Sequence, residues 1–276
     1  MNRFNQDSQN TFKNIQGLIL DMDGVLWRQN QPIGNLPALF DQIRGLNLRH
    51  VLATNNSTLT PDQYTQKLER FGVQIEPWQV LTSAVAAGMY LHQCYPQGGK
   101  VYIIGEAGLQ QALESYGFEH SDGQHTLAVV VGLDRNCDYN KLKKATLLVR
   151  AGAALIGTNP DRTFPTPEGL VPGAGALIAA LEAATEVKAC IVGKPEPEMY
   201  RGALHRLGTT PEETLVVGDR LETDIAGAQA LGCRTALVLS GVTQAEAVYA
   251  WSPEPDLILP DLSAVLSYLT QSKFPD

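Results

Sequence analysis

Residues 18–25 read Leu-Ile-Leu-Asp-Met-Asp-Gly-Val, an apolar run that leads directly into two aspartates, two positions apart, and a glycine. A continuously apolar strand is typical of a strand buried on both faces of a parallel sheet. In open α/β sheets, ligands bind beyond the carboxyl ends of such strands. The segment therefore predicts a buried strand that places Asp21 and Asp23 in a ligand-binding crevice.

The two aspartates predict a cation beside them. Alternating side-chain directions place both near one face if the strand extends that far, and close carboxylates repel unless a cation separates them. A hard divalent ion suits such oxygen ligands. Two other interpretations stay open, an ordinary strand that ends in an Asp-Gly turn and a fragment of an EF-hand. The EF-hand fits less well, because Trp27, Arg28 and Pro32 occupy the region where the calcium loop needs oxygen ligands.

Short apolar runs alternate with amphipathic stretches along the whole chain. This alternation predicts βαβ units and an α/β fold with a mainly parallel sheet. The clearest helix opens at Thr60, with Pro61 at its first position, Gln63 completing a capping box and Gly72 as its stop. The expected strands span residues 16–20, 49–53, 101–104, 127–131, 154–157, 189–192, 215–217 and 235–239.

Polar side chains follow three of the other predicted strands. Residues 54–57, Thr-Asn-Asn-Ser, offer hydroxyl, amide and backbone N–H donors just before a helix, which is the chemistry of a phosphate cradle. In residues 193–195, Gly-Lys-Pro, the lysine lies between a glycine and a proline, which suits an ammonium group held at one fixed position. Residues 218–224 supply two more carboxylates, Asp219 and Asp224. Each segment alone is more often structural, but four such strand ends in one chain favour a shared functional site.

Residues 53–56 and 157–160 show a weak internal similarity, because in both segments a predicted strand is followed by Thr-Asn. Similar geometry at the two strand ends explains this better than a duplication.

Composition limits the classes of partner. The chain has 276 residues, enough for one large domain or two ordinary ones, and two are expected. Its 21 Lys+Arg against 29 Asp+Glu give a formal charge of -8 without a basic stripe, which argues against nucleic acid as a partner. An anionic substrate would need a metal or local cations to offset this charge.

The cysteines and the hydropathy indicate a cytoplasmic protein. Four cysteines, at 94, 137, 190 and 233, form no Cys-x-x-Cys motif, which fits reduced thiols rather than a zinc cluster or redox pair. The first residues are polar, and no apolar run reaches the length of a membrane span. We therefore expect neither a membrane partner nor export.

The order of the motifs is Asp-x-Asp-Gly, then strand-Thr-Asn, then strand-Gly-Lys-Pro, then strand-Gly-Asp-x-x-x-x-Asp. In this order the chain resembles the haloacid dehalogenase (HAD) superfamily of phosphohydrolases. The match is closest to the branch with 4-nitrophenylphosphatase, phosphoglycolate and pyridoxal phosphate phosphatases and NagD-type nucleotidases. Residues 21–27, 55–57, 154–175 and 218–225 carry the resemblance.

The resemblance implies a doubly wound, Rossmann-like parallel-sheet core with an inserted α/β cap domain of the large C2 type. The expected boundaries are residues 1–82 and 188–276 for the two parts of the core and residues 83–187 for the cap.

The resemblance also implies a mechanism. Asp21 is the expected nucleophile, forming an aspartyl-phosphate, and Asp23 is the expected general acid and then base. An acid at this second position goes with phosphoryl transfer in the superfamily, whereas dehalogenases lack it. Lys194 is expected to neutralise Asp21 and the charge of the transition state.

The expected cofactor is Mg²⁺, bound by the Asp21 carboxylate, the Asp23 backbone carbonyl and the Asp219 carboxylate. Asp224 is expected to hold a metal-bound water. The residues expected to bind phosphoryl oxygens are Thr54, Asn55, Asn56 and Lys194. The expected substrates are small phosphorylated metabolites, including p-nitrophenyl phosphate, phosphoglycolate, pyridoxal phosphate and nucleoside monophosphates.

Two rival classes share these features. One is a phospho-acceptor receiver domain, which gathers acidic residues, a Thr and a Lys around magnesium, but its acceptor follows an upstream acidic pair in a much shorter chain. The other is a catalytically silent phosphate-binding protein on the same fold. The natural substrate stays open, with Asp161 as the one candidate for a contact to the leaving group. A homodimer through the cap is expected only by analogy.

Overall fold

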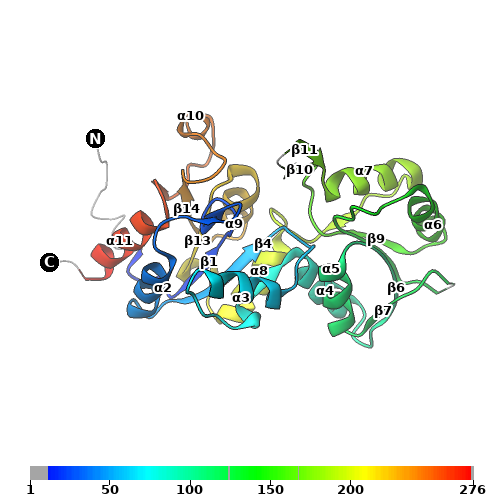
Figure 1. The fold of residues 1–276 in the computed structure, drawn as a ribbon, viewed down its shortest axis with the longest axis horizontal. Helices are drawn as coiled ribbons and strands as arrows, with labels where there is room; N and C mark the ends of the chain where they lie inside the picture. The colour runs from blue at the N-terminus through cyan, green and yellow to red at the C-terminus, as the bar shows by residue number, and fades with distance from the viewer. Residues whose placement is uncertain (1–11, 124, 167, 275–276) are drawn as a thin grey trace. The chain divides into compact units, whose positions relative to one another are not determined.

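The chain forms two compact units in the computed structural model, which describes residues 12–123, 125–166 and 168–274 (Figure 1). The first unit contains the described residues up to Ala53, Thr65–Val80 and those from Ala203 onwards. The second contains Thr54–Tyr64 and Leu81–Gly202. The second unit therefore draws most of its residues from one long segment between two parts of the first.

A six-stranded sheet forms the centre of the first unit. All four residues of its strand β1 (Gly17–Leu20) are buried, as the apolar run predicted. Its neighbours β4 and β13 both run parallel to it, with Ile19 opposite Val51 on one side and Val216 on the other. The strand order is β15 (Leu257–Leu259), β14 (Arg234–Val238), β13 (Thr214–Gly218), β1, β4 (Arg49–Thr54) and β5 (Val80–Thr82).

The order of the strands reverses direction at β1. The chain proceeds from β1 through β4 to β5 on one side, and from β13 through β14 to β15 on the other. The carboxyl edge at such a switch point is where doubly wound sheets bind ligands. The predicted α/β fold class is confirmed, and the Asp-x-Asp segment lies at the switch point.

Two helices of the first unit show how the sequence fixes their ends. Asn35 caps α2 (Leu36–Gly45) by accepting a hydrogen bond from the Ala38 N–H, and Asp261 caps α11 (Leu262–Lys273) in the same way. The predicted helix start at Thr60 is also confirmed, because α3 (Pro61–Arg70) has Gln63 and Thr60 in a reciprocal capping box. The other helices that include residues of this unit are α8 (Pro197–Leu207), α9 (Ala226–Ala230) and α10 (Ala245–Val248).

A five-stranded parallel sheet forms the centre of the second unit. Its order is β12 (Cys190–Ile191), β9 (Ala154–Gly157), β8 (Ala128–Val131), β6 (Gly99–Ile104) and β7 (Phe118–His120). Side chains of β6, β8 and β9 pack in one hydrophobic core with those of helices α6 (Tyr139–Arg150) and α7 (Ala174–Thr185). The unit also contains α4 (Ser83–Cys94), α5 (Ala107–Ser115) and an antiparallel hairpin of β10 (Thr163–Thr166) and β11 (Gly169–Pro172).

All eight predicted strands are present, with boundaries within two residues of those expected. The predicted cap boundary after residue 187 lies shortly before β12, which pairs with β9 in the second sheet. The sequence analysis did not identify the short strands β5, β7 and β15 or the β10–β11 hairpin.

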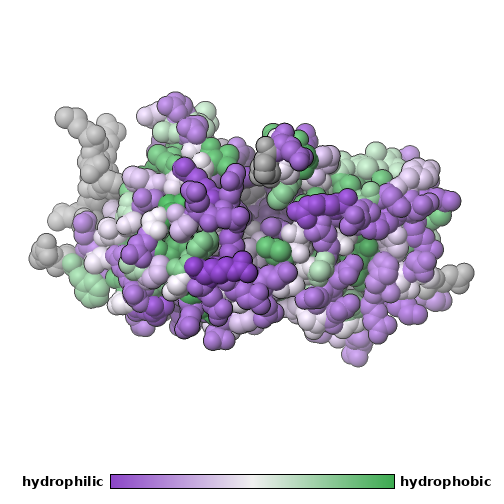
Figure 2. Space-filling view, viewed as in Figure 1, coloured by the Kyte–Doolittle hydropathy of each residue, from purple (hydrophilic) through white to green (hydrophobic). Residues whose placement is uncertain are grey.

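Hydrophilic side chains cover most of the face shown in Figure 2, with hydrophobic residues in scattered areas between them. Scattered surface hydrophobics of this kind are ordinary in globular proteins. Within the described residues, no helix combines the length and the apolar character needed to cross a membrane.

Candidate active site

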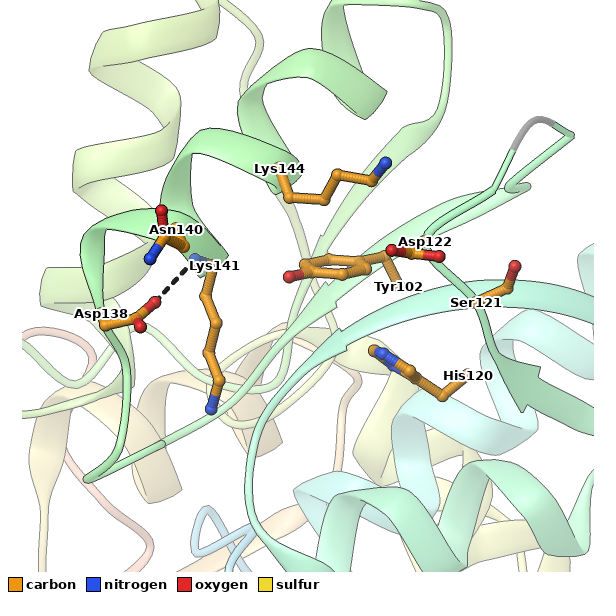
Figure 3. Close-up of a pocket in the computed structure, with 8 residues that line it drawn as sticks. All are labelled: Tyr102, His120, Ser121, Asp122, Asp138, Asn140, Lys141 and Lys144. Carbon is orange, nitrogen blue, oxygen red and sulfur yellow. Dashed lines mark hydrogen bonds between the residues drawn. The ribbon is translucent and has the colours of Figure 1, made fainter.

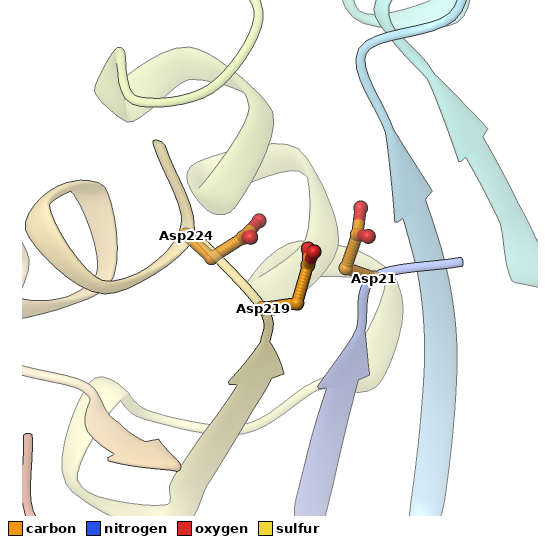
Figure 4. Close-up of side chains that lie close together, drawn as sticks. All are labelled: Asp21, Asp219 and Asp224. Carbon is orange, nitrogen blue, oxygen red and sulfur yellow. The ribbon is translucent and has the colours of Figure 1, made fainter. Parts of the chain in front are cut away.

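Three carboxylates meet at the carboxyl edge of the first sheet (Figure 4). Asp21 directly follows β1 and Asp219 directly follows β13, while Asp224 lies one helical turn further on. One ligand oxygen from each of the three lies within 4.8 Å of the others. Asp219 and Asp224 are each only 1% exposed and Asp21 is half-buried. The strand ends therefore concentrate negative charge, as residues 18–25 and 218–224 predicted.

Backbone N–H groups hold the two buried carboxylates in place. The Val242 N–H donates to Asp219 Oδ2 over 2.7 Å. The Arg220 N–H donates to Asp224 Oδ2 over 3.1 Å, across the π-helical turn Leu221–Ile225. Such bonds stabilise the charged form of a carboxylate and fix its direction.

Three glycines allow the backbone to approach these carboxylates. A Cβ on Gly241 would lie 1.9 Å from Asp219 Oδ2, and a Cβ on Gly24 would lie 2.4 Å from the same oxygen. A Cβ on Gly218 would lie 2.2 Å from Asp224 Cβ. Gly24 also has a φ of +92°, which other residues rarely adopt. Gly24 and Gly218 belong to motifs visible in the sequence, whereas no motif marks Gly241 or Val242.

The cluster fits a hard divalent cation. Three close carboxylates repel one another strongly in a buried site, and a cation between them removes that cost. Oxygen ligands on two or three carboxylates are typical of Mg²⁺ and Ca²⁺ sites. Among the described residues of the first unit, Asp21, Asp219 and Asp224 are therefore a group that could hold a metal.

Asp23 does not belong to this cluster and makes a different contact. Its side chain is exposed, and its Oδ1 accepts a hydrogen bond of 2.8 Å from the indole N–H of Trp27. The exposed carboxyl group keeps access to a substrate oxygen, as a general acid requires.

The remaining predicted residues lie in the second unit, where Asn55 occupies the centre of a polar network. Its backbone carbonyl accepts hydrogen bonds from Ser83 Oγ over 2.6 Å and Asn159 Nδ2 over 2.8 Å. Its side-chain Nδ2 donates to the Lys194 carbonyl over 2.9 Å and makes a longer contact of 3.4 Å with Asp161 Oδ2. The structure thus brings Asn55, Lys194 and Asp161 together from three distant segments.

The two Thr-Asn segments also meet in this network. The side chain of Asn159, in the second segment, bonds the backbone of Asn55, in the first. Asn56 has a different part, because its Oδ1 accepts hydrogen bonds from both the N–H and the hydroxyl of Thr58, at 2.8 Å each. An amide oxygen only accepts hydrogen bonds, so Nδ2 is the group of the Asn56 side chain that could donate to an anion. Thr54 is the last residue of β4 and its Oγ1 accepts from the Asn56 N–H over 3.2 Å.

Lys194 is 4% exposed, so its ammonium group is held within the protein. The preceding Gly193 permits this placement, since a Cβ there would lie 2.3 Å from the Thr158 carbonyl oxygen and 2.7 Å from Asn55 Oδ1. A buried ammonium group needs nearby negative charge or polar partners. Its burial agrees with the prediction of a cation at a fixed point.

A separate cavity of about 560 Å³ lies in the second unit and contains none of the predicted site residues (Figure 3). Tyr102, His120, Lys141 and Lys144 are among the residues that line it. His120 Nδ1 accepts the Ile103 N–H over 3.1 Å, so this ring has a structural contact.

Comparison with known proteins places the chain in a family. Residues 18–119 match the family described as Haloacid dehalogenase-like hydrolase, and residues 191–265 match a HAD-hydrolase-like family. An acid sugar phosphatase of Staphylococcus aureus (strain USA300) is 36% identical over 257 residues, which cover 93% of this chain and 99% of that protein.

Solved structures agree with this placement. The 4-nitrophenylphosphatase from Thermotoga maritima has a TM-score of 0.87 and 31% identity, covering 93% of this chain and 98% of that one. NagD from E. coli K-12 has a TM-score of 0.84 and 33% identity, covering 90% and 97%. The chain belongs to the haloacid dehalogenase-like hydrolases, as a phosphoric monoester hydrolase of the branch that contains NagD and the 4-nitrophenylphosphatases.

Proposed function

We propose that this enzyme hydrolyses phosphate monoesters of small metabolites in a Mg²⁺-dependent reaction through an aspartyl-phosphate. The observation that carries the proposal is the cluster of Asp21, Asp219 and Asp224 at the carboxyl edge of the sheet, with Asp23 two residues after the first of them. Candidate substrates are p-nitrophenyl phosphate, sugar phosphates, phosphoglycolate, pyridoxal phosphate and nucleoside monophosphates. The relatives named acid sugar phosphatase and 4-nitrophenylphosphatase support the first two.

The reaction has two displacements at phosphorus. A carboxylate oxygen of Asp21 forms a bond to phosphorus while the ester P–O bond breaks, and Asp23 transfers its proton to the departing oxygen. Water then attacks the phosphorus of the aspartyl-phosphate and gives a proton to the Asp23 carboxylate. The acyl-phosphate P–O bond breaks, which releases inorganic phosphate and restores Asp21.

Mg²⁺ would be held by the carboxylates of Asp21 and Asp219 and the backbone carbonyl of Asp23, with Asp224 holding a water on the ion. It would offset the charge of the aspartates and of the phosphoryl oxygens.

The residues proposed to bind the phosphate are those for which the family resemblance implies that role. Thr54 and Asn55 would donate to phosphoryl oxygens, with Asn56 Nδ2 as a further donor, and the Lys194 ammonium group would neutralise charge in the transition state. Asp161 would contact the leaving group. The division into core (1–82 and 188–276) and cap (83–187) belongs to the same proposal.

The partner is a small phosphorylated metabolite rather than nucleic acid or a membrane, and two copies of the chain would associate through the cap. The cytoplasmic location expected from the scattered cysteines is part of this proposal.

The test is release of inorganic phosphate from p-nitrophenyl phosphate and a panel of the metabolites above. Turnover should require Mg²⁺, stop with EDTA and return when Mg²⁺ is restored. Asp21→Asn should abolish it. The control Asp41→Asn removes an exposed carboxylate on α2 that pairs with Arg44, and should retain full turnover.

The rival functions give other outcomes. A single phosphate released per chain without turnover would indicate a phospho-acceptor module. Binding of the esters without any cleavage would indicate a silent phosphate-binding protein.

A further inference from the structure

Asp23, the predicted general acid, is hydrogen-bonded to the buried indole ring of Trp27. Trp27 is fully buried, and its Nε1 donates to Asp23 Oδ1 over 2.8 Å. An indole N–H donates along one fixed direction in the plane of its ring. The bond therefore holds the exposed Asp23 side chain in one orientation.

Backbone hydrogen bonds fix the loop independently of this side chain. The Gly24 N–H donates to the Trp27 carbonyl over 2.7 Å, and the Leu26 N–H donates to the Met22 carbonyl over 2.8 Å. The indole N–H consequently affects the direction of the Asp23 carboxyl group more than the path of the chain.

A lysine lies over the same indole ring. The Nζ of Lys67, on α3, is 4.0 Å from the ring centroid, and it also donates to the Gln29 carbonyl over 3.0 Å. Partial burial lowers the pKa of Lys67, and the negative charge of Asp23 opposes that shift. A cation over an indole face is attracted to the ring and strengthens the ring's N–H as a donor.

Asp23 Oδ1 is thus occupied by the Trp27 N–H, which leaves Oδ2 to carry the proton. We propose that Trp27 and Lys67 are positioning residues for general acid catalysis, holding Asp23 so that its Oδ2–H faces the departing ester oxygen. In this step the O–H bond of Asp23 breaks, the electron pair of the ester P–O bond moves to the leaving oxygen, and the proton joins it. The proposal rests on the proposed function.

A buried Trp usually finds some partner for its N–H, so the contact alone is also what a purely structural Trp would show. The two roles differ in one measurable respect. Proton donation matters most for a basic leaving group and little for an acidic one, because an acidic leaving group departs without help. A purely structural defect lowers the rates on both kinds of ester by the same factor.

The test compares phenyl phosphate with p-nitrophenyl phosphate, two esters of similar size whose leaving groups differ in basicity. The measured quantity is kcat/KM, which reports the steps up to departure of the leaving group. Trp27→Phe replaces the indole by a smaller aromatic ring that has no N–H. It should lower kcat/KM about 10-fold on phenyl phosphate and no more than about 2-fold on p-nitrophenyl phosphate.

Trp251→Phe is the matched control. Its Nε1–H is buried and donates to no partner among the described residues, so the same substitution removes an N–H that makes no hydrogen bond. It should leave the ratio of the two kcat/KM values unchanged. An unchanged ratio in Trp27→Phe would overturn the proposal.

Lys67 provides a second test that does not disturb a fully buried residue. Lys67→Met should raise the ratio of kcat/KM on p-nitrophenyl phosphate to kcat/KM on phenyl phosphate by about 3-fold. Lys67→Arg should keep the wild-type ratio, because the arginine keeps a cation over the ring. Equal ratios in both variants and the wild type would overturn the role of Lys67.

Asp23→Asn separates this inference from the function on which it rests. If Asp23→Asn raises the ratio and Trp27→Phe does not, only the positioning role fails. If Asp23→Asn leaves the ratio unchanged, or the wild type cleaves neither ester, the proposed function itself fails.

Discussion

At the scale of single residues, the site combines carboxylates that are buried with one that is exposed. Asp219 and Asp224 are inaccessible and fixed by backbone N–H groups, whereas Asp23 reaches solvent and is held by one indole N–H. Fixed carboxylates suit a bound cation, and an accessible one suits proton transfer. The difference in burial therefore suits the buried aspartates to cation binding and the exposed aspartate to proton transfer.

Lys194 carries the sharpest prediction at this scale. Lys194→Ala should lower kcat/KM on p-nitrophenyl phosphate by roughly 100-fold or more, because it removes a positioned cation from developing negative charge. The measurement is steady-state phosphate release at saturating Mg²⁺. Lys188→Ala, which removes an ammonium group whose side chain is 89% exposed, should have no effect. Full activity in Lys194→Ala would remove this residue from the mechanism.

At the scale of elements, the loop after β14 completes the site through its backbone. The Val242 N–H of this loop donates to Asp219. The loop also contains Gly241, where a side chain would collide with the Asp219 carboxylate. The acidic residues that follow β1 and β13 belong to recognisable motifs, which is why the sequence predicts them. A backbone N–H and a glycine leave no side-chain pattern in the sequence. The role of this loop could therefore not be predicted.

Gly241→Ala tests the loop directly. The added methyl group would displace Asp219 Oδ2, so turnover should fall by about 100-fold and the Mg²⁺ concentration for half-maximal activity should rise. Gly45→Ala, at the end of α2, adds the same group where no atom lies within 4 Å and should change neither quantity. Equal behaviour of the two variants would show that Asp219 tolerates the displacement.

The elements that the sequence predicted best are the apolar strands of four to six residues at the centres of both sheets. Strands β5, β7 and β15 have only three residues each, too few for an apolar pattern to distinguish them from loops. The repeated Thr-Asn pair was more informative than its length suggested, since a hydrogen bond from Asn159 Nδ2 to the Asn55 carbonyl joins the two segments in the structure.

At the scale of the whole molecule, stability should depend on the bound cation. The proposed Mg²⁺ would bind the folded cluster and not the unfolded chain, so saturating Mg²⁺ should raise the Tm of the wild type by on the order of 5 °C. Differential scanning fluorimetry with and without EDTA measures this shift. It needs no substrate and is independent of turnover.

Asp219→Asn should abolish that shift. In metal-free buffer its Tm should equal or exceed that of the wild type, because one of three mutually repelling carboxylates becomes neutral. Asp41→Asn should keep the full shift. A Tm that responds to Mg²⁺ equally in Asp219→Asn and the wild type would place the cation elsewhere.

The position of β1 between β4 and β13 also has a consequence for biosynthesis. The ribosome makes Asp21 near the start of the chain, whereas β13, which carries Asp219 at its end, is made roughly 200 residues later, and contacts so distant in sequence form late. Translation of the second unit intervenes. A nascent chain would therefore hold Asp21 long before it holds Asp219, and the proposed metal site would form only after β13 has been made.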